Sequence, residues 1–287
     1  MRPQVKAALL LAGAMLSFSS MGVLVKWAGG EIPAIEQVFF RGLVGMAILG
    51  TMAWRRGVDL RGRNHRLLLL RGLVGTAALI LFFHAVTRIP VAEAVLLNQA
   101  TPIFVLPMAA WLLKERIGWR HWLLAAVALG GVTLVLRPGF GGFNLPGMLA
   151  LLSAAFAAVA YITVRRLAGS ESSLTIVFWF TAISTLVSAP LMLPWFAVPS
   201  PAALAALVGI GVLATAGQLL LTLAYRHGEA GRLAVLGSLG ALFGAGWDLL
   251  LWGHVPDGWT AAGGIVAIAA CAALQRTGPG RPQPRPA

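Results

Sequence analysis

Ten apolar stretches follow one another along almost the whole of this sequence, and each is about twenty residues long, the length that spans a bilayer as an α-helix. They lie near residues 7–27, 33–54, 67–87, 91–112, 119–136, 146–166, 173–196, 201–225, 231–252 and 259–275. Only helices and closed barrels satisfy every backbone polar group inside hydrocarbon. The sequence therefore predicts an all-α integral membrane protein with ten transmembrane helices and short connections.

The composition excludes the soluble classes of protein. Hydrophobic residues make up 59% of the chain and charged residues 11%, whereas a soluble domain carries roughly 25% charged residues. The net charge of +13 does not indicate nucleic acid as a partner, because the basic residues form short clusters between the apolar stretches. Cys271 is the single cysteine and no histidine has a partner at ligand spacing, so we expect neither a disulfide nor a metal site.

The basic residues are distributed unevenly between the two sets of connections. With the N-terminus inside, 17 Lys and Arg residues fall on the cytoplasmic side, and only Lys26, Arg88 and Arg137 fall on the other. Cytoplasmic loops of membrane proteins carry such an excess of positive charge. Both termini are therefore predicted to be cytoplasmic, and the Pro-rich segment 277–287 is predicted to be a disordered cytoplasmic tail.

The two halves of the sequence align when one is shifted by 139 residues; Thr76-Ala77, for example, falls on Thr215-Ala216. Single matches are weak in such a composition, but one offset also superposes the span boundaries. We therefore expect two five-helix repeats, 1–139 and 140–276. Because the first span belongs to the repeat, it is retained and is not a cleaved signal peptide.

An odd number of helices in each repeat means that the second copy enters the membrane from the opposite side. Inverted repeats of this kind supply two exchangeable conformations around a site at the midplane, which is the basis of alternating access. The sequence contains no Walker motif, no His-Glu-x-x-His and no paired intramembrane aspartates. This pattern favours a secondary transporter, with no catalytic residue and no cofactor, over an intramembrane enzyme.

Short motifs also follow one another along the chain in a recognisable order. They are Phe39-Phe40-Arg41, Leu70-Arg71-Gly72, Ile89-Pro90-Val91-Ala92-Glu93-Ala94, Thr101-Pro102-Ile103-Phe104, Leu113-Lys114-Glu115-Arg116, Arg137-Pro138-Gly139, Gly217-Gln218, Ala224-Tyr225-Arg226 and Gly253-His254-Val255-Pro256-Asp257. With its ten spans and two halves, the sequence resembles the drug/metabolite transporter (DMT) superfamily, in the branch with two EamA domains. The resemblance implies a multi-pass transporter of small organic metabolites in the cytoplasmic (inner) membrane of a bacterium.

Two positions depart from the pattern of that family. Lys114 stands where a Gly is common after the fourth span, and His254 stands where a Glu is common after the ninth. These departures leave open any role for a symmetric pair of carboxylates. The pattern looks most like the members that carry S-adenosylmethionine, riboflavin and related metabolites.

Polar side chains inside hydrocarbon are costly, so each must face a cavity, find a partner or reach the interface. Arg41 lies eight residues into the second span and either faces the cavity or bonds backbone carbonyls; Arg71 lies four residues into the third and either faces the cavity or reaches the interface. The predicted substrate-binding residues are Arg41, Arg71, Asn98, Gln99, Tyr161, Trp179, Gln218 and Trp247.

The reasons differ among the other members of this set. Pro102 cannot donate to the helix ladder, which predicts an unwound polar segment at Asn98 and Gln99. These side chains are predicted to line the cavity, with a hydrogen bond between helices as the alternative, and Gln218 has the same two interpretations. The three aromatic residues are predicted to be deep enough to stack on a planar substrate, with ordinary packing as the alternative.

Four residues near the span ends are predicted to act in gating or coupling. Lys26 and Glu36 lie at facing ends of the first two spans and are predicted to pair. His84 is either an interfacial residue or a proton-coupling group, and Asp248 either pairs with a basic residue or lies in the interface. With Lys26 neutralised, Arg41 and Arg71 face at most one acid, which predicts an anionic or zwitterionic substrate. A lipid flippase or a facilitative channel of the same fold remains the alternative, and a homodimer is left open.

Overall fold

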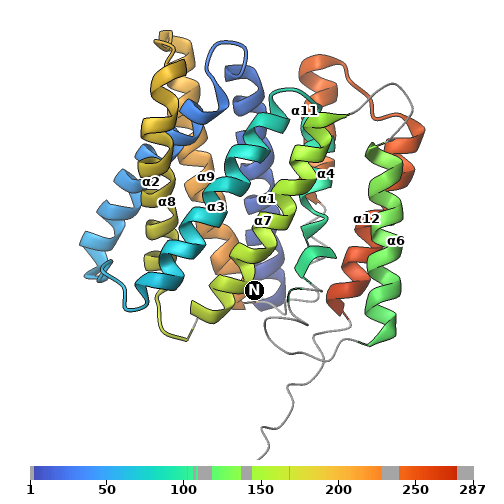
Figure 1. The fold of residues 1–287 in the computed structure, drawn as a ribbon, viewed down its shortest axis with the longest axis horizontal. Coiled ribbons are helices and arrows are strands. Elements are labelled where there is room, and N and C mark those ends of the chain that lie inside the picture. Colours follow the sequence, from blue (N-terminus) through green and yellow to red (C-terminus); the bar gives the residue numbers. More distant parts are fainter. Residues whose placement is uncertain are drawn as a thin grey trace, which may run out of the picture.

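The computed structural model describes residues 3–101, 103–105, 108, 118–136, 144–167, 169–227 and 239–276. Within these ranges the elements are all helical. They are α1 (Pro3–Ala28), α2 (Ala34–Arg56), α3 (His65–Val86), α4 (Val91–Asn98), α6 (Trp119–Leu136), α7 (Leu145–Leu167), α8 (Ser173–Met192), the short 3₁₀ helix η1 (Leu193–Trp195), α9 (Pro201–His227), α11 (Leu239–Trp252) and α12 (Gly258–Arg276). The helices run side by side as one bundle (Figure 1).

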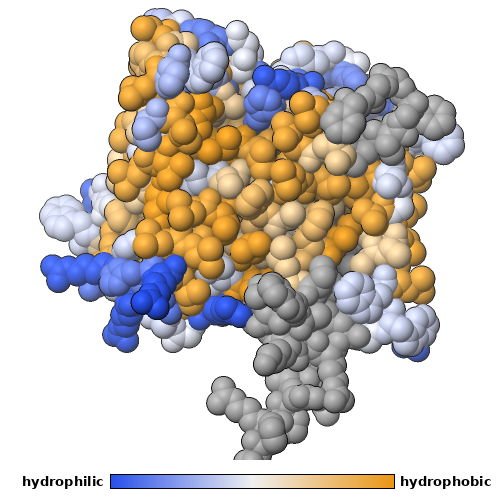
Figure 2. All heavy atoms as spheres, in the orientation of Figure 1, coloured by the Kyte–Doolittle hydropathy of each residue, from blue (hydrophilic) through white to orange (hydrophobic). Residues whose placement is uncertain are grey.

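Six of these helices, α1, α2, α3, α7, α8 and α9, are long and apolar enough to cross a membrane. Shorter apolar helices coincide with the other four predicted spans, so the count of ten spans stays a prediction. Apolar residues cover most of the face seen in Figure 2, and hydrophilic residues gather towards its two ends. The chain is therefore a multi-pass membrane protein. The predicted tail, 277–287, lies outside the described residues.

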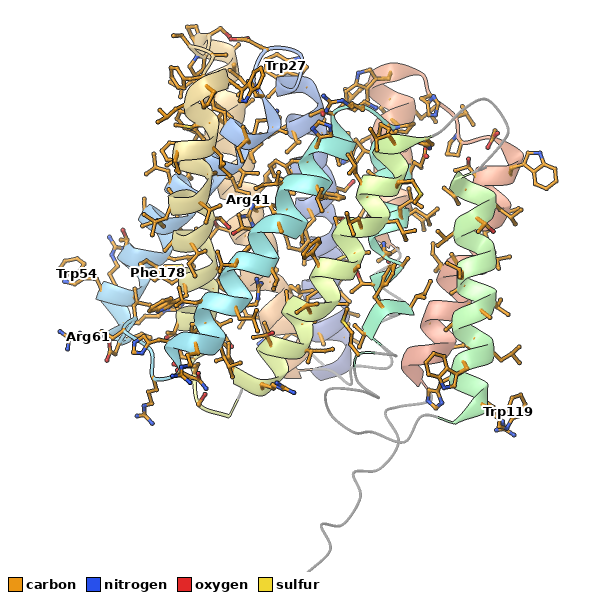
Figure 3. All side chains as sticks on the ribbon, viewed as in Figure 1. Trp27, Arg41, Trp54, Arg61, Trp119 and Phe178 are labelled. Atoms are coloured by element: carbon orange, nitrogen blue, oxygen red, sulfur yellow. The ribbon has the colours of Figure 1, made fainter. Side chains whose placement is uncertain are left out.

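The bundle has two ends, which we name after exposed residues labelled in Figure 3. At the Trp27 end, the Glu31 carboxylate accepts hydrogen bonds from the backbone N–H of Ser200, at 2.6 Å, and from its hydroxyl, at 2.9 Å. At the Arg61 end, the Glu171 carboxylate accepts hydrogen bonds from the backbone N–H groups of Arg63, at 2.6 Å, and Asn64, at 2.7 Å. Each contact joins the connection after the first helix of one half to the start of a helix in the other half.

Packing between the halves holds the bundle together. The most extensive contacts join α1 to α9, α3 to α7, α6 to α12 and α2 to α8, and one apolar core runs through most of the helices. Small residues allow the closest approach: a Cβ at Gly131 of α6 would come within 2.6 Å of the backbone of α12 at Gly263 and Ala267. In a bilayer such close backbone contact replaces the hydrophobic effect as the source of helix association.

Candidate functional site: two buried arginines on one aromatic ring

Arg41 and Arg71 meet inside the bundle on the ring of Phe180. The guanidinium carbon of Arg41, from α2, lies 5.3 Å from the ring centroid, and that of Arg71, from α3, lies 4.3 Å from it. The two cations are therefore at most about 10 Å apart, since both distances are measured to the same point. The side chains are 6% and 8% exposed. Figure 3 shows Arg41 between the two ends of the bundle.

Glycine provides the space for this arrangement. Gly75 lies one turn after Arg71 on α3, and a Cβ at that position would collide with Arg71 Nη1 and come within 2.9 Å of the Phe180 ring. A larger residue at this position would therefore displace the guanidinium from the ring. Arg71 is thus buried inside the bundle.

The two guanidinium groups have few protein partners. Arg41 Nε, Arg71 Nε and Arg71 Nη1 are buried and form no hydrogen bond. Among the described residues, no carboxylate forms an ion pair with either arginine. A buried charge without a counter-charge is costly, whereas a carboxylate or phosphate accepts a guanidinium in bidentate fashion. The arginine pair therefore presents unused donors to an anionic group.

Tyr161 is exposed although it lies on the inward face of α7. Met148 and Leu152 belong to the exposed stripe of α7, and Ala150 lies on the opposite, buried face. Tyr161 follows Ala150 by about three turns and so shares its face, yet its side chain is 54% exposed. It also interacts electrostatically with Arg71. The phenol group of Tyr161 is therefore available for contact with a bound molecule.

Sequence reasoning missed Phe180 and the polar face of α8 that follows it. Thr181, Ser184, Thr185 and Ser188 are all buried and recur with the spacing of one helix face. Most of these hydroxyls donate to carbonyls one turn earlier on α8, and Ser184 bonds Thr76 of α3 at 2.9 Å. That spacing is visible in the sequence, although which helices the face contacts is not.

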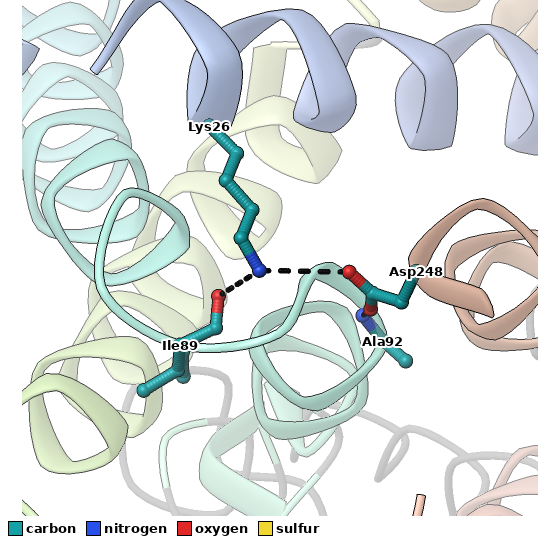
Figure 4. Close-up of polar contacts among 4 residues, drawn as sticks. All are labelled: Lys26, Ile89, Ala92 and Asp248. Atoms are coloured by element: carbon teal, nitrogen blue, oxygen red, sulfur yellow. Dashed lines mark hydrogen bonds and ion pairs between the residues drawn. The ribbon is translucent and has the colours of Figure 1, made fainter. Parts of the chain in front are cut away.

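At the Trp27 end, the predicted pairing of Lys26 with Glu36 is wrong. Lys26 Nζ instead lies 3.6 Å from Asp248 Oδ1 and donates a hydrogen bond to the Ile89 carbonyl at 3.2 Å (Figure 4). Asp248 is completely buried, and its second oxygen accepts the backbone N–H of Ala92 at 2.9 Å. The packing of α11 against α1 and α4 brings this acid to Lys26, and nothing local in the sequence records that packing.

Glu36 has a different environment. Its side chain is completely buried, and one carboxylate oxygen accepts the backbone N–H of Ala197 at 3.0 Å. Its other oxygen, Oε1, has no hydrogen-bond partner. The carboxyl group therefore lies against the connection between α8 and α9.

The predicted unwound segment is confirmed. Helix α4 ends at Asn98, and Gln99 and Ala100 form a turn. The side-chain amide of Asn98 donates to the Ser153 hydroxyl of α7 at 2.8 Å, which is the predicted alternative of a hydrogen bond between helices. The Thr101 hydroxyl donates to the backbone carbonyl of Asn98 at 2.6 Å. Pro102 lies outside the described residues.

The remaining predicted residues are distributed over several elements of the bundle. Trp179, which directly precedes Phe180 in α8, donates from its indole to the carbonyl of Leu60 at 2.9 Å, towards the Arg61 end. His84 lies at the opposite end, in the last turn of α3. Gln218 and Trp247 are half-buried in α9 and α11. Gln99 approaches Gly240 of α11.

A bundle with six helices of membrane-spanning length defines this chain as a multi-pass membrane protein. The model of the EamA-like transporter family matches it twice, at residues 5–137 and 145–275, and the chain belongs to that family. The resemblance noted in the sequence is thereby confirmed.

Named relatives align along nearly the whole chain. The pseudopaline exporter CntI of Pseudomonas aeruginosa is 39% identical over 95% of this chain and 97% of its own length. The riboflavin transporter of Rhizobium johnstonii is 26% identical over 93% and 89%, and the S-adenosylmethionine uptake transporter of Rickettsia prowazekii is 26% identical over 89% and 87%. A solved crystal structure shares the fold, with a TM-score of 0.63 at 22% identity over 96% of both chains.

Proposed function

We propose that this protein is a secondary transporter that moves small anionic or zwitterionic metabolites across the cytoplasmic membrane of a bacterium by alternating access. The observation that carries the proposal is the pair formed by Arg41 and Arg71, which share one aromatic ring and have no acid partner among the described residues. The relatives named for pseudopaline, riboflavin and S-adenosylmethionine support a small organic metabolite as the substrate.

The arginine pair acts in this proposal as the binding site. A substrate carboxylate or phosphate takes up the unused donors of both guanidinium groups, which removes the cost of burying them. The Phe180 ring, which both guanidinium groups contact, holds the two cations in place by cation–π contact.

The packing of the helices supports two inverted repeats, 1–139 and 140–276. The 139-residue shift takes α1 to α7, α2 to α8 and α3 to α9. In agreement with such an exchange, α1 packs on α9 as α7 packs on α3, and α2 packs on α9 as α8 packs on α3. The Glu31 and Glu171 contacts lie at opposite ends and correspond in the same way. Alternate opening of these two ends is how such repeats expose one site to each side in turn.

Counterflow into proteoliposomes tests the proposal. Purified protein is expected to exchange labelled against unlabelled compound for at least one of pseudopaline, riboflavin and S-adenosylmethionine. Saturable exchange distinguishes a carrier from a channel, which gives no counterflow, and movement of labelled lipid instead would indicate a flippase. Absence of exchange with all three, and with a wider set of carboxylated metabolites, would refute the proposal.

Disulfide trapping tests the alternation itself. In a Cys271→Ala background, Glu31→Cys with Ser200→Cys places a pair of thiols at the Trp27 end, where the native contact is 2.6 Å. Oxidation of this pair should stop counterflow and reduction should restore it. Undiminished counterflow with the disulfide formed would show that this end does not open during transport.

A further inference from the structure

Two carboxylates are completely buried in the described part of the chain, and only one of them has a counter-charge. Asp248 pairs with Lys26 at 3.6 Å. Glu36 has the Ala197 N–H as its hydrogen-bond donor, and its Oε1 atom has no partner. The pairing of Lys26 with Asp248 thus leaves Glu36 without the cation that the sequence suggested for it.

The elements packed on this part of α2 supply no other cation. From Ser173 to Ala224, which covers α8, the following connection and nearly all of α9, the sequence contains no Asp, Glu, Lys, Arg or His. Both helices pack directly on α2. On α2 itself, the guanidinium of Arg41 lies over Phe180.

The other charged and titratable groups near the Trp27 end are engaged elsewhere. Glu31 bonds Ser200, and the guanidinium of Arg88, at the end of α3, donates to the backbone carbonyl of its neighbour His84. Neither Arg88 nor His84 forms an ion pair with Glu36. None of these groups therefore neutralises the carboxylate of Glu36, and a bound proton is what remains to do so.

We propose that Glu36 is a proton-binding site that couples substrate movement to the proton gradient, an inference that rests on the transport function proposed above. An isolated carboxylate is costly to bury, whereas a neutral carboxyl group costs far less. In the closed state, Glu36 holds the proton. When the Trp27 end opens, water replaces the Ala197 N–H and the proton leaves to that side. Glu36 takes up its next proton from the opposite aqueous phase while the Arg61 end is open, so each cycle carries one proton across the membrane and needs no further reactant.

The position of Glu36 makes its protonation sensitive to conformation. Glu36 belongs to the first half of the chain, and the Ala197 N–H that it accepts belongs to the second. Any separation of the halves at this end breaks the bond and hydrates the carboxyl group. Because binding a proton favours the state that buries the group, protonation and closure promote each other.

Infrared difference spectroscopy between acidic and alkaline buffers tests this on the full-length protein in liposomes without substrate. The wild type should show the carbonyl band of a buried, protonatable carboxyl group, and Glu36→Gln should lack it. Glu31→Gln, the same substitution five residues earlier on an exposed carboxylate, is the matched control and should keep the band. A band that persists in Glu36→Gln, or is lost in Glu31→Gln, would overturn the assignment. If Glu36→Gln does not fold, Glu36→Asp must shift the band in frequency, and an unshifted band would overturn it equally.

A transport measurement separates coupling from transport. With whichever of pseudopaline, riboflavin and S-adenosylmethionine the wild type exchanges, Glu36→Gln should retain counterflow and lose accumulation driven by a pH gradient. Accumulation that survives in Glu36→Gln would contradict the coupling role. If the wild type exchanges none of the three, the proposed function is in question, while the infrared result still decides whether Glu36 binds the proton.

Discussion

The ion pair between Lys26 and Asp248 gives a prediction about stability in which the two partners are unequal. The Asp248 side chain is 0% exposed and the Lys26 side chain 20% exposed. Lys26 also keeps the Ile89 carbonyl and the ring of Trp252, 4.7 Å from its ammonium, when the acid is removed. Removing the base therefore leaves the more isolated charge.

The expected magnitudes follow from this difference. Lys26→Met leaves a fully buried carboxylate unpaired and should lower the free energy of unfolding by about 3–5 kcal/mol. Asp248→Asn leaves a partly exposed ammonium that has two other contacts, and should cost about 1–2 kcal/mol. The double variant removes both charges and should be more stable than Lys26→Met alone, because neutral replacement of a buried pair is close to neutral in energy.

A double-mutant cycle on purified protein in one detergent measures these values from the unfolding transition of each variant. Size-exclusion chromatography before unfolding confirms that each variant is folded. The reasoning is refuted if the two single variants cost the same, or if the double variant costs the sum of the two, because the pair would then contribute no coupling energy.

Three further predictions concern the site, the packing and the topology. Arg41→Gln should raise the KM for an anionic substrate more than tenfold, equivalent to about 1.4 kcal/mol, while Arg55→Gln, at the exposed end of the same helix, should leave it unchanged in counterflow assays; equal KM values would make Arg41 structural. Gly131→Leu should lower the melting temperature because a side chain there meets the backbone of α12, whereas Gly130→Leu, at a position with nothing within 4 Å, should not; similar shifts would contradict the close packing. Reporter fusions after Gln275 should be active only as cytoplasmic reporters, and phosphatase activity outside the membrane would contradict the predicted orientation.

The membrane character and the family follow from local features of the sequence. Apolar stretches of spanning length must form helices because the backbone has no other partner in hydrocarbon, and the structure has apolar helices at all ten positions. The break at Asn98 was predictable for a similar reason, since Pro102 affects hydrogen bonds only within its own helix.

The burial of Arg41 was also predictable, because its depth follows from its position along the span. The hydrogen-bond partner of Trp179 was not: its indole bonds the connection between α2 and α3 at Leu60. Counting residues along one helix does not show where a connection from another part of the chain lies.

Partners, in contrast, were decided by the tertiary structure alone. The sequence placed Lys26, Glu36 and Asp248 at span ends. The packing of α11 against α1 then brings Lys26 into an ion pair with Asp248 and leaves Glu36 without a cation. The same holds for Phe180, which receives Arg41 and Arg71 because α8 packs on both α2 and α3. Periodicity and hydropathy indicate which faces of each segment are apolar, and so whether the segment lies in lipid, in water or in the protein interior. Which segments pack together depends on contacts between residues far apart in the chain. That packing determines which of the buried charged side chains form ion pairs.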